Sequence, residues 1–294
     1  MSVYDKSGNL LQTVYDKSGQ ALSAAFSADG TQIFPDGPIA LKVCTYNVGG
    51  WYIGSGTNVP ADKDAVFYAL QNGMLSDINA DILCIEEYWS VFSNTGRTAE
   101  SLLSQYYPYI RSAGGTTTYY GRAICSKYPI TSYVSHYYTN ETSRYYDVAT
   151  INVSGTAVYV VVTHLSANNI PNRIAQAVEL YNFIVAQGWE KYMVFGDFNS
   201  PLHDPFSEQN TGIYQQFLDD GCTIANGGAF GILNTACNSA DWATDAFAID
   251  NIICSDGITI ESVATDLTKT TDSDVLATGK IDHIPLYADI EIPR

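Results

Sequence analysis

The hydrophobic positions of the chain follow different patterns before and after residue 40. Before it they are short and broken, whereas from residue 40 onward apolar runs of strand length alternate with stretches of helical spacing. The runs ALKVCTYN, DILCIEE and AVYVVVTHL are almost wholly apolar, which is typical of strands buried on both faces. We therefore predict an α/β domain over residues 39–294 and a separate extension over residues 1–38.

Other strand-like and helix-like segments complete the pattern of the predicted domain. The remaining strand-like runs are GRAICSKYPI, TSYVSHYY, DVATINV, KYMVFG, FAIDNIICS, ITIESVATDL and HIPLYADIEI. One helix is predicted where Phe67, Leu70, Met74 and Ile78 recur, and another at PNRIAQAVELYNFIVAQG, which has proline near its start and glycine at its end. Many strands in mixed order with few helices predict an α/β or α+β sandwich, in which sheets pack together and helices lie outside.

The extension is built from an 11-residue repeat. VYDKSG at residues 3–8 recurs at 14–19, and a diverged copy, AFSADG, lies at 25–30. Each copy ends in a turn signal, so we expect short β-turn units that are too small to bury a core of their own. Two interpretations stay open: an extension packed at the domain edge, or an element that attaches to another protein or to a second copy of the chain. Such tandem segments are similar to those at the start of some phage-associated proteins.

Composition narrows the class of protein and of partner. No apolar run approaches the ~20 residues of a membrane-spanning helix, and the first residues, MSVYDKSGNLLQ, do not have the layout of a signal peptide. We expect a cytoplasmic or phage-associated protein. With 14 basic and 31 acidic residues the formal net charge is −17, which repels nucleic acid at long range. A polyanionic substrate would therefore need local compensation, most simply by bound divalent cations.

Six cysteines are spaced irregularly along the chain. Four of them lie inside apolar runs, where a cysteine usually serves as a small buried hydrophobic residue: Cys44, Cys84, Cys125 and Cys254. Cys222 and Cys237 lie in a loop-rich region and could pair in an oxidising compartment. The spacing alone leaves that pairing open.

Polar side chains recur at the ends of the predicted strands. They are Asn47, Glu86, Glu87, His164, Asp197, Asn199, Asp250, Asp282 and His283. Charged groups beside apolar strands carry a desolvation cost unless they are paired or bind a metal. Singly each has an ordinary structural explanation. Jointly they are the residue types of a metal-assisted phosphoester hydrolase, in which oxygen ligands hold Mg²⁺ or Mn²⁺, histidines contact a phosphoryl oxygen and a carboxylate activates water.

An ordered series of short motifs carries a family resemblance. TYN, DILCIEE, AICSKYPI, VVTHLS, RIAQ, GDFNS, IDNI and IDHIPL, from about residue 40 to residue 292, resemble the motifs of the endonuclease/exonuclease/phosphatase superfamily. The order and number of the motifs make the resemblance specific, whereas any one alone would be weak. It implies a deoxyribonuclease I-like fold, α/β (α+β), with four layers: two packed mixed β-sheets flanked by helices.

The resemblance also implies a role for each matching residue. Asn47, Glu87 and Asp282 would hold Mg²⁺, Mn²⁺ or Ca²⁺, and His164 would bind the scissile phosphate. Asp197 would deprotonate the attacking water, and Asn199 would steady a phosphoryl oxygen. Asp250 would orient His283, which would stabilise the pentacoordinate transition state. The enzyme class implied is a metal-dependent phosphoric-ester hydrolase.

Three positions depart from the family pattern. Glu86 stands where the family commonly has glutamine, and adds a negative charge. Ile281 replaces the usual serine before Asp282, which could remove a supporting hydrogen bond. TYYGRAICSK contains no glutamate to pair with His164, unlike the deoxyribonuclease-like members.

The substrate is less closely defined than the reaction. Arg122 either points at the phosphate or faces solvent from a strand. A nucleic acid is the first hypothesis. A lipid head group, for which GGWYIGSG or GGAFGIL would be a contact loop, or a small phosphorylated metabolite is the second. A non-catalytic binding module is the third, and its discriminating feature would be the loss of a residue that the chemistry requires.

Overall fold

The structure is a computed structural model that describes residues 25–26, 32–34, 37–49, 63–90, 98–113, 121–202, 211–237, 246–265 and 282–294. By its internal contacts the chain divides into a unit of Met1–Ile39 with Pro293–Arg294 and a unit of Ala40–Ile292. In the first unit, strand β1 (Ala25–Phe26) pairs antiparallel with β2 (Gln32–Phe34). The first two copies of the 11-residue repeat lie outside the described residues, and the role of the extension stays a prediction.

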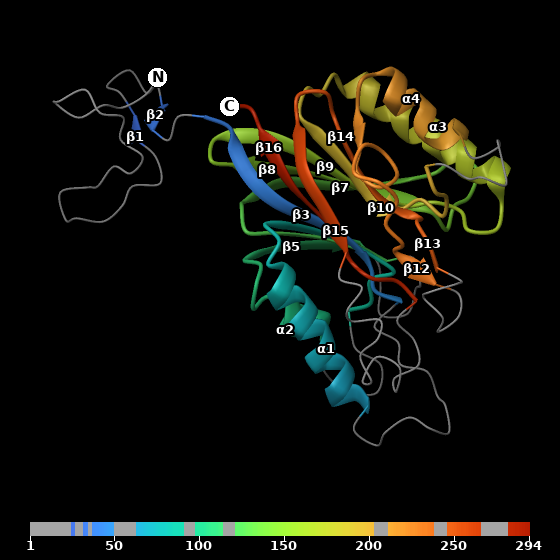
Figure 1. Cartoon of the computed structure of the whole chain (residues 1–294), viewed down its shortest axis with the longest axis horizontal. Helices are drawn as coiled ribbons and strands as arrows, with labels where there is room; N and C mark the ends of the chain where they lie inside the picture. The colour runs from blue at the N-terminus through green and yellow to red at the C-terminus, as the bar shows by residue number, and fades with distance from the viewer. Residues whose placement is uncertain are drawn as a thin grey trace. The chain divides into compact units, whose positions relative to one another are not determined.

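Two six-stranded sheets form the second unit (Figure 1). The first has the order β15 (Thr259–Thr265), β16 (Leu286–Ile292), β3 (Ile39–Asn47), β4 (Ile82–Glu86), β6 (Arg122–Ser126), β5 (Tyr109–Ala113). The second has the order β11 (Thr223–Ile224), β14 (Asp250–Cys254), β10 (Tyr192–Asp197), β9 (Thr156–His164), β8 (Tyr145–Val153), β7 (Ile130–Tyr137). Both sheets are mixed, because β3 runs parallel to β4 and β9 parallel to β10, whereas β4 pairs antiparallel with β6 and β10 with β14. Two short strands, β12 (Ala236–Cys237) and β13 (Ala246–Phe247), also pair antiparallel.

Helices cover the outer face of each sheet. Helices α1 (Lys63–Ile78) and α2 (Ala99–Leu103) share a hydrophobic cluster with the first sheet, and α3 (Ile170–Gln187) and α4 (Thr211–Asp219) share one with the second. Between the sheets, β4 contacts β9 and β10, and β6 contacts β8 and β9. The layers therefore run helices, sheet, sheet, helices, as Figure 1 shows, and the predicted four-layer sandwich is confirmed.

The apolar runs that predicted buried strands are buried. Every residue of β4 and of β10 is inaccessible to solvent or nearly so. In β4, Leu83 and Ile85 pack in the cluster with α1 and α2. The alternation of side chains along a strand then turns Ile82 and Cys84 toward the second sheet. Burial of each such aliphatic side chain stabilises the fold by about 1.5–3 kcal/mol.

Helix α3 begins and ends where the sequence predicts. The side chain of Asn169 accepts a hydrogen bond from the backbone N–H of Asn172 at 3.0 Å, which caps the first turn. Pro171 stands in that turn, where no N–H is needed. Gly188 ends the helix in the left-handed conformation, with φ of 67°. These residues fix the length of the segment that leads into β10.

The run GRAICSKYPI differs from its prediction as one strand. Strand β6 ends at Ser126, β7 begins at Ile130, and the two belong to different sheets. Pro129 explains the break, because proline has no N–H to continue a ladder of hydrogen bonds. The Ser126 hydroxyl accepts the backbone N–H of Tyr128 at 2.9 Å and supports the bend. All six cysteines, Cys222 and Cys237 among them, are free and buried.

Candidate active site

Two rows of polar side chains meet at one end of the sandwich. On the second sheet, His164 ends β9 opposite Asp197 of β10, and Asp197 lies opposite Asp250 of β14. On the first sheet, Asn47 ends β3 opposite Glu86 of β4. Residues directly opposite on paired strands present their side chains on the same face. The Asn47 amide Nδ2 donates to Asp197 Oδ2 at 3.1 Å, a contact that joins the two rows.

One oxygen of Asp197 is the point on which the site converges. Besides the Asn47 amide, Asp197 Oδ2 lies 3.4 Å from His164 Nε2 and 3.7 Å from His283 Nε2. The other oxygen, Oδ1, accepts the backbone N–H of Asn199 at 2.8 Å. Burial is the main cause that raises the pKa of Asp197 to about 7. A carboxylate with a pKa near neutrality can accept a proton from water at physiological pH.

His283 and Asp250 form a buried pair beside this carboxylate. His283 Nδ1 donates to Asp250 Oδ2 at 2.9 Å. Burial acts to lower the pKa of His283, but the charge and hydrogen bond of Asp250 offset it, and the pKa rises to about 10. The ring is therefore an imidazolium at neutral pH, with Nε2 directed toward Asp197.

Two acidic residues lie next to Asn47. Glu87 Oε1 accepts from Asn47 Nδ2 at 3.4 Å, and Asp282 Oδ1 would lie 3.4 Å from a Cβ at Gly49. Burial is the main cause that raises the pKa of Glu87. The charge of His283 and the hydrogen bond from Asn47 lower this pKa in part, and the charge of Asp282 raises it. A cation beside Glu87 would stabilise the charged form of this carboxylate, because a nearby positive charge offsets the cost of its burial.

A second group of possible metal ligands adjoins the first. One ligand atom from each of Asp197, Asp250 and His283 lies within 4.8 Å of the other two, the one such group of histidine, cysteine, aspartate and glutamate side chains in the described part of the chain. The hydrogen bond between His283 and Asp250 already occupies one of these atoms on each side chain. A cation at this group would therefore compete with that hydrogen bond.

Backbone geometry explains why the motifs have their particular residues. A Cβ on Gly196 would lie 2.2 Å from the carbonyl oxygen of Thr163, so only glycine fits at this point of the β9–β10 pair. Glu87 and Asn199 both adopt the left-handed conformation, with φ of 51° and 50°. Asparagine is tolerant of this conformation, whereas glutamate pays a cost of order 1–3 kcal/mol. Strain at a residue that turns its carboxylate into the site is typical of functional positions.

Two arginines support His164 from behind. Arg122 Nη2 and Arg144 Nη1 donate to the His164 carbonyl oxygen at 3.4 and 3.3 Å. Arg122 is fully buried, and its guanidinium lies 4.0 Å from the centre of the Tyr145 ring. The Arg122 side chain is exposed neither to solvent nor at the surface of the site. Its predicted contact with phosphate therefore stays a prediction without geometric support. The pKa of His164 lies well below its usual range, first because of burial and then because of the two arginine charges.

Glu86 is buried at the end of β4. The carboxyl is fully buried, and Oε1 accepts from the Thr45 hydroxyl at 2.8 Å. Burial and then the charge of Asp250 hold its pKa well above the usual range. Burial therefore disfavours the charged form of this carboxyl.

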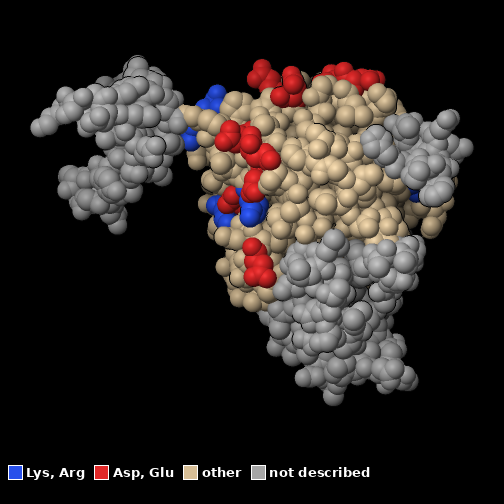
Figure 2. Space-filling model, viewed as in Figure 1, with Lys and Arg blue, Asp and Glu red and all other residues tan. Residues whose placement is uncertain are grey.

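The surface around the sandwich is acidic on the face drawn in Figure 2. Aspartate and glutamate side chains form several groups there, and lysine and arginine are few.

The Asn199 side chain is held at the end of β9, because its Nδ2 donates to the Leu165 carbonyl at 3.0 Å. Within the described ranges, no helix is long and apolar enough to cross a membrane.

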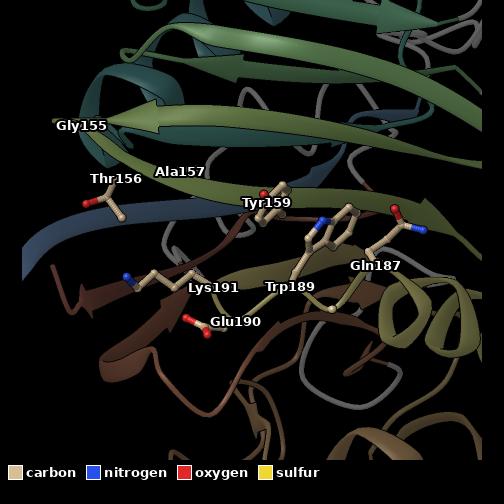
Figure 3. Close-up of a pocket in the computed structure, with 9 residues that line it drawn as sticks. Gly155, Thr156, Ala157, Tyr159, Gln187, Trp189, Glu190 and Lys191 are labelled. Atoms are coloured by element: carbon tan, nitrogen blue, oxygen red, sulfur yellow. The ribbon is translucent and has the colours of Figure 1, made fainter.

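A separate hollow of about 520 Å³ lies at the opposite ends of β9 and β10 (Figure 3). It is lined by Gly155, Thr156, Ala157, Tyr159, Gln187, Gly188, Trp189, Glu190 and Lys191. The rings of Tyr159 and Trp189 stack on each other at 4.4 Å, so each occupies one face of the other. None of the predicted site residues lines this hollow.

Comparison with known proteins identifies the family. A model of the endonuclease/exonuclease/phosphatase family matches residues 44–274, and the chain belongs to that family. Its members are phosphoester hydrolases and are generally dependent on divalent metals, so this chain is a phosphoester hydrolase by class. No curated protein matches the sequence.

Solved structures agree with the fold. TDP2 from D. rerio, complexed with single strand DNA product, has 15% identity and a TM-score of 0.65, covering 85% of this chain and 98% of its own. A Bacteroides thetaiotaomicron endonuclease/exonuclease/phosphatase family protein has 12% identity and a TM-score of 0.63, covering 88% and 100%. ANGEL2, a 2',3'-cyclic phosphatase in complex with adenosine-2',3'-vanadate, has 14% identity and a TM-score of 0.63, covering 87% and 96%. At these identities the similarity shows the fold alone.

Most of the predicted site residues come together in space. Six of them form one connected group: Asn47, Glu87, His164, Asp197, Asp250 and His283. Asn199 and Asp282 adjoin the group, and Arg122 lies behind it. Sequence reasoning missed Thr235 and Asn226, both of which bond to the backbone of Asp250. No motif spacing in the sequence indicates these two residues, because each bonds to Asp250 from a loop.

Proposed function

We propose that the protein is a divalent-metal-dependent phosphodiesterase that cuts nucleic acid by attack of an activated water on phosphorus. The observation that carries the proposal is the convergence on Asp197 Oδ2 of one amide and two imidazoles within 3.1–3.7 Å. A carboxylate so surrounded can hold a water and accept its proton, while the neighbouring groups contact the phosphoryl oxygens.

Each side chain of the site then has a defined part. Asp197 accepts the proton of the attacking water, and its pKa of about 7 suits that task. His283, kept protonated by Asp250, donates from Nε2 to an oxygen that gains negative charge in the transition state. His164 is neutral and donates one hydrogen bond to the scissile phosphate. Asn199 lies beside Asp197 and steadies a phosphoryl oxygen.

The donor set at Asn47, Glu87 and Asp282 fits a hard divalent cation. Two carboxylates supply oxygen ligands, and the Asn47 amide oxygen, which accepts the Gly49 N–H at 3.0 Å, has a second lone pair to offer. Oxygen ligands are the kind that Mg²⁺ and Mn²⁺ prefer. Because burial raises the pKa of Glu87, a nearby positive charge would stabilise the ionised form of this carboxylate. A cation bound there would neutralise charge on the phosphate and stabilise the leaving oxygen. It would also provide the local compensation that a chain of net charge −17 needs to accept a polyanion.

Nucleic acid is the substrate that we place first. The similar folds include TDP2 complexed with single strand DNA product and ANGEL2 in complex with an adenosine vanadate. The scarcity of basic side chains argues for a substrate held through few phosphates, such as a strand end. Because each neutralised phosphate contributes about −0.7 to −0.9 to the slope of log affinity against log salt, we expect a shallow salt dependence.

A metal and salt series on a labelled single-stranded oligonucleotide tests this proposal. We expect products with Mg²⁺ or Mn²⁺, none with EDTA, and a rate that falls only about twofold to tenfold between low and physiological salt. Cleavage that persists in EDTA would refute the metal requirement. Hydrolysis of a small diester without any cutting of the oligonucleotide would refute the choice of substrate.

A lipid phosphodiester is a second candidate, favoured by one observation. The loop of GGAFGIL, residues 227–233, exposes 62% of Ile232, and Asn226 braces the loop by bonding both the N–H and the carbonyl of Leu233. A rigid loop with an exposed apolar side chain suits contact with lipid. Hydrolysis of sphingomyelin vesicles that Ile232→Asp abolishes, with small-diester activity retained, would favour this candidate. The GGWYIGSG loop at 49–56 lies, apart from Gly49, outside the described residues.

A further inference from the structure

Thr235 is a buried residue that the chemistry does not use directly. It lies one residue before β12 and has no exposed surface. Its hydroxyl oxygen accepts two backbone N–H groups, that of Ile249 at 3.2 Å and that of Asp250 at 3.1 Å. A single side-chain oxygen therefore holds the first residue of β14, Asp250, whose carboxylate projects into the site.

The same residue is joined to the segment that carries His283. The Thr235 carbonyl accepts the backbone N–H of Ile284 at 2.8 Å. The adjoining Ala236 is bridged to His283, and Cys237 N–H donates to the Asp282 carbonyl at 2.8 Å. Thr235 thus contacts Asp250 through its hydroxyl and, through its backbone carbonyl, Ile284, the residue that follows His283.

A second side chain completes the support of Asp250. Asn226 Nδ2 donates to the Asp250 carbonyl at 3.1 Å, and the Asn226 backbone exchanges two hydrogen bonds of 2.8 Å with the side chain of Asn251. Both asparagines are buried. Both backbone polar groups of Asp250 are therefore bonded to side chains of the segment from Asn226 to Thr235, and only the carboxylate faces the site.

We propose that Thr235 is a positioning residue of the active site, whose hydroxyl sets the distance between Asp250 and His283. The role rests on the proposed function, in which that pair acts on the transition state. Loss of the hydroxyl leaves two buried N–H groups without an acceptor and frees the start of β14 to shift. A displacement of about 1 Å in such a pair can cost about a hundredfold in rate, so the expected effect lies in kcat rather than in KM.

Two substitutions and a matched control test the role. Thr235→Val keeps the volume and removes the acceptor, and Thr235→Ser restores the hydroxyl. The control is Ser255→Ala, at the other end of β14, since the Ser255 hydroxyl also accepts a backbone N–H, that of Tyr192 at 3.1 Å. Rates are measured on bis(p-nitrophenyl) phosphate with Mg²⁺, and thermal melting confirms that each variant is folded.

Spectroscopy gives a readout that does not depend on turnover. The chain has four histidines, so a protein labelled with ¹⁵N-histidine gives a simple imidazole spectrum. The low-field proton of His283 Nδ1 is assigned by its loss in Asp250→Asn. We expect Thr235→Val to shift or broaden this resonance and to lower kcat about 10- to 100-fold with little change in KM, and we expect Thr235→Ser and Ser255→Ala to leave both near wild type.

The outcomes separate the two proposals. An unchanged His283 resonance in folded Thr235→Val, or a kcat within about twofold of wild type, overturns the positioning role. A wild-type protein that hydrolyses no diester overturns the proposed function, and the resonance still decides the role of Thr235. If Thr235→Val does not fold, Thr235→Ala, which leaves room for a water in place of the hydroxyl, is compared in the same spectra.

Discussion

Replacement of Asp250 by asparagine should change the pH dependence of the enzyme as well as its rate. In the native pair, His283 Nδ1 lies 2.9 Å from Asp250 Oδ2, and the pKa of His283 is raised to about 10. Asparagine keeps the shape and removes the charge. Burial then acts with less opposition, and the pKa of His283 falls toward or below its ordinary value near 6.5.

The size of the effect follows from the fraction of imidazolium. With a pKa near 10 the ring is almost fully protonated at pH 7.5, whereas with a pKa near 6.5 only about one ring in eleven is protonated. If His283 must donate a hydrogen bond from Nε2 of a positively charged ring, kcat/KM at that pH falls at least about tenfold. The raised pKa keeps activity up to high pH, so in the variant the alkaline limb of the pH profile moves down by about 3.5 pH units or more.

The assay is kcat/KM on bis(p-nitrophenyl) phosphate from about pH 6 to about pH 9.5 at saturating Mg²⁺. Asp289→Asn is the control, because Asp289 is an exposed carboxylate whose partners are Lys42 and Ser262. A folded Asp250→Asn protein with a wild-type pH profile would refute the assignment of His283 as the charged donor.

Four further substitutions probe metal binding, two glycine positions and the buried arginine. Glu87→Gln should raise the Mg²⁺ concentration for half-maximal activity at least about tenfold, because it removes a proposed metal ligand. Gly196→Ala should destabilise the fold by about 1–3 kcal/mol or more in urea unfolding, since its Cβ would lie 2.2 Å from a carbonyl oxygen of β9. Gly73→Ala in α1, where a Cβ meets nothing within 4 Å, should stabilise it by up to about 1 kcal/mol. Arg122→Met should cost about 3–5 kcal/mol, because it leaves the buried carboxylate of Asp147 without the neighbouring charge that lowers its pKa.

Each of these predictions has a contradicting result. An unchanged Mg²⁺ requirement in Glu87→Gln would place the cation elsewhere. Equal unfolding midpoints for Gly196→Ala and Gly73→Ala would show that β9 and β10 can separate at no cost. A wild-type midpoint for Arg122→Met, measured by the same urea titration, would show that the guanidinium adds no net stability.

The fold was predictable where the hydrophobic pattern was unambiguous. The fully apolar runs that became β4 and β10 could hardly be anything other than buried strands, and Asn169, Pro171 and Gly188 marked the ends of α3. The predictions missed β5, α2 and α4, all of them short elements whose positions depend on tertiary contacts. GRAICSKYPI was divided between two sheets, a choice that local pattern does not encode.

The site was predictable as a set of residue types and less so as a geometry. Asn47, His164 and Asp197 end strands, and parallel or mixed pairing brings strand ends together at one edge. The sequence could not show that Arg122 is buried behind His164, because a strand position alone does not say which face is covered. Nor could it show that burial and the charge of Asp250 raise the pKa of Glu86.

Hydrolysis of bis(p-nitrophenyl) phosphate by the wild-type protein and by Asp197→Asn, each with Mg²⁺ and with EDTA, is the decisive comparison. The variant keeps the shape of the side chain at the point where Asn47, His164 and His283 converge, and removes its capacity to accept a proton. We predict metal-dependent turnover by the wild type that EDTA abolishes, and a loss of at least about two orders of magnitude in the folded variant. Turnover in Asp197→Asn equal to that of the wild type, or turnover indifferent to EDTA, would contradict the proposed mechanism.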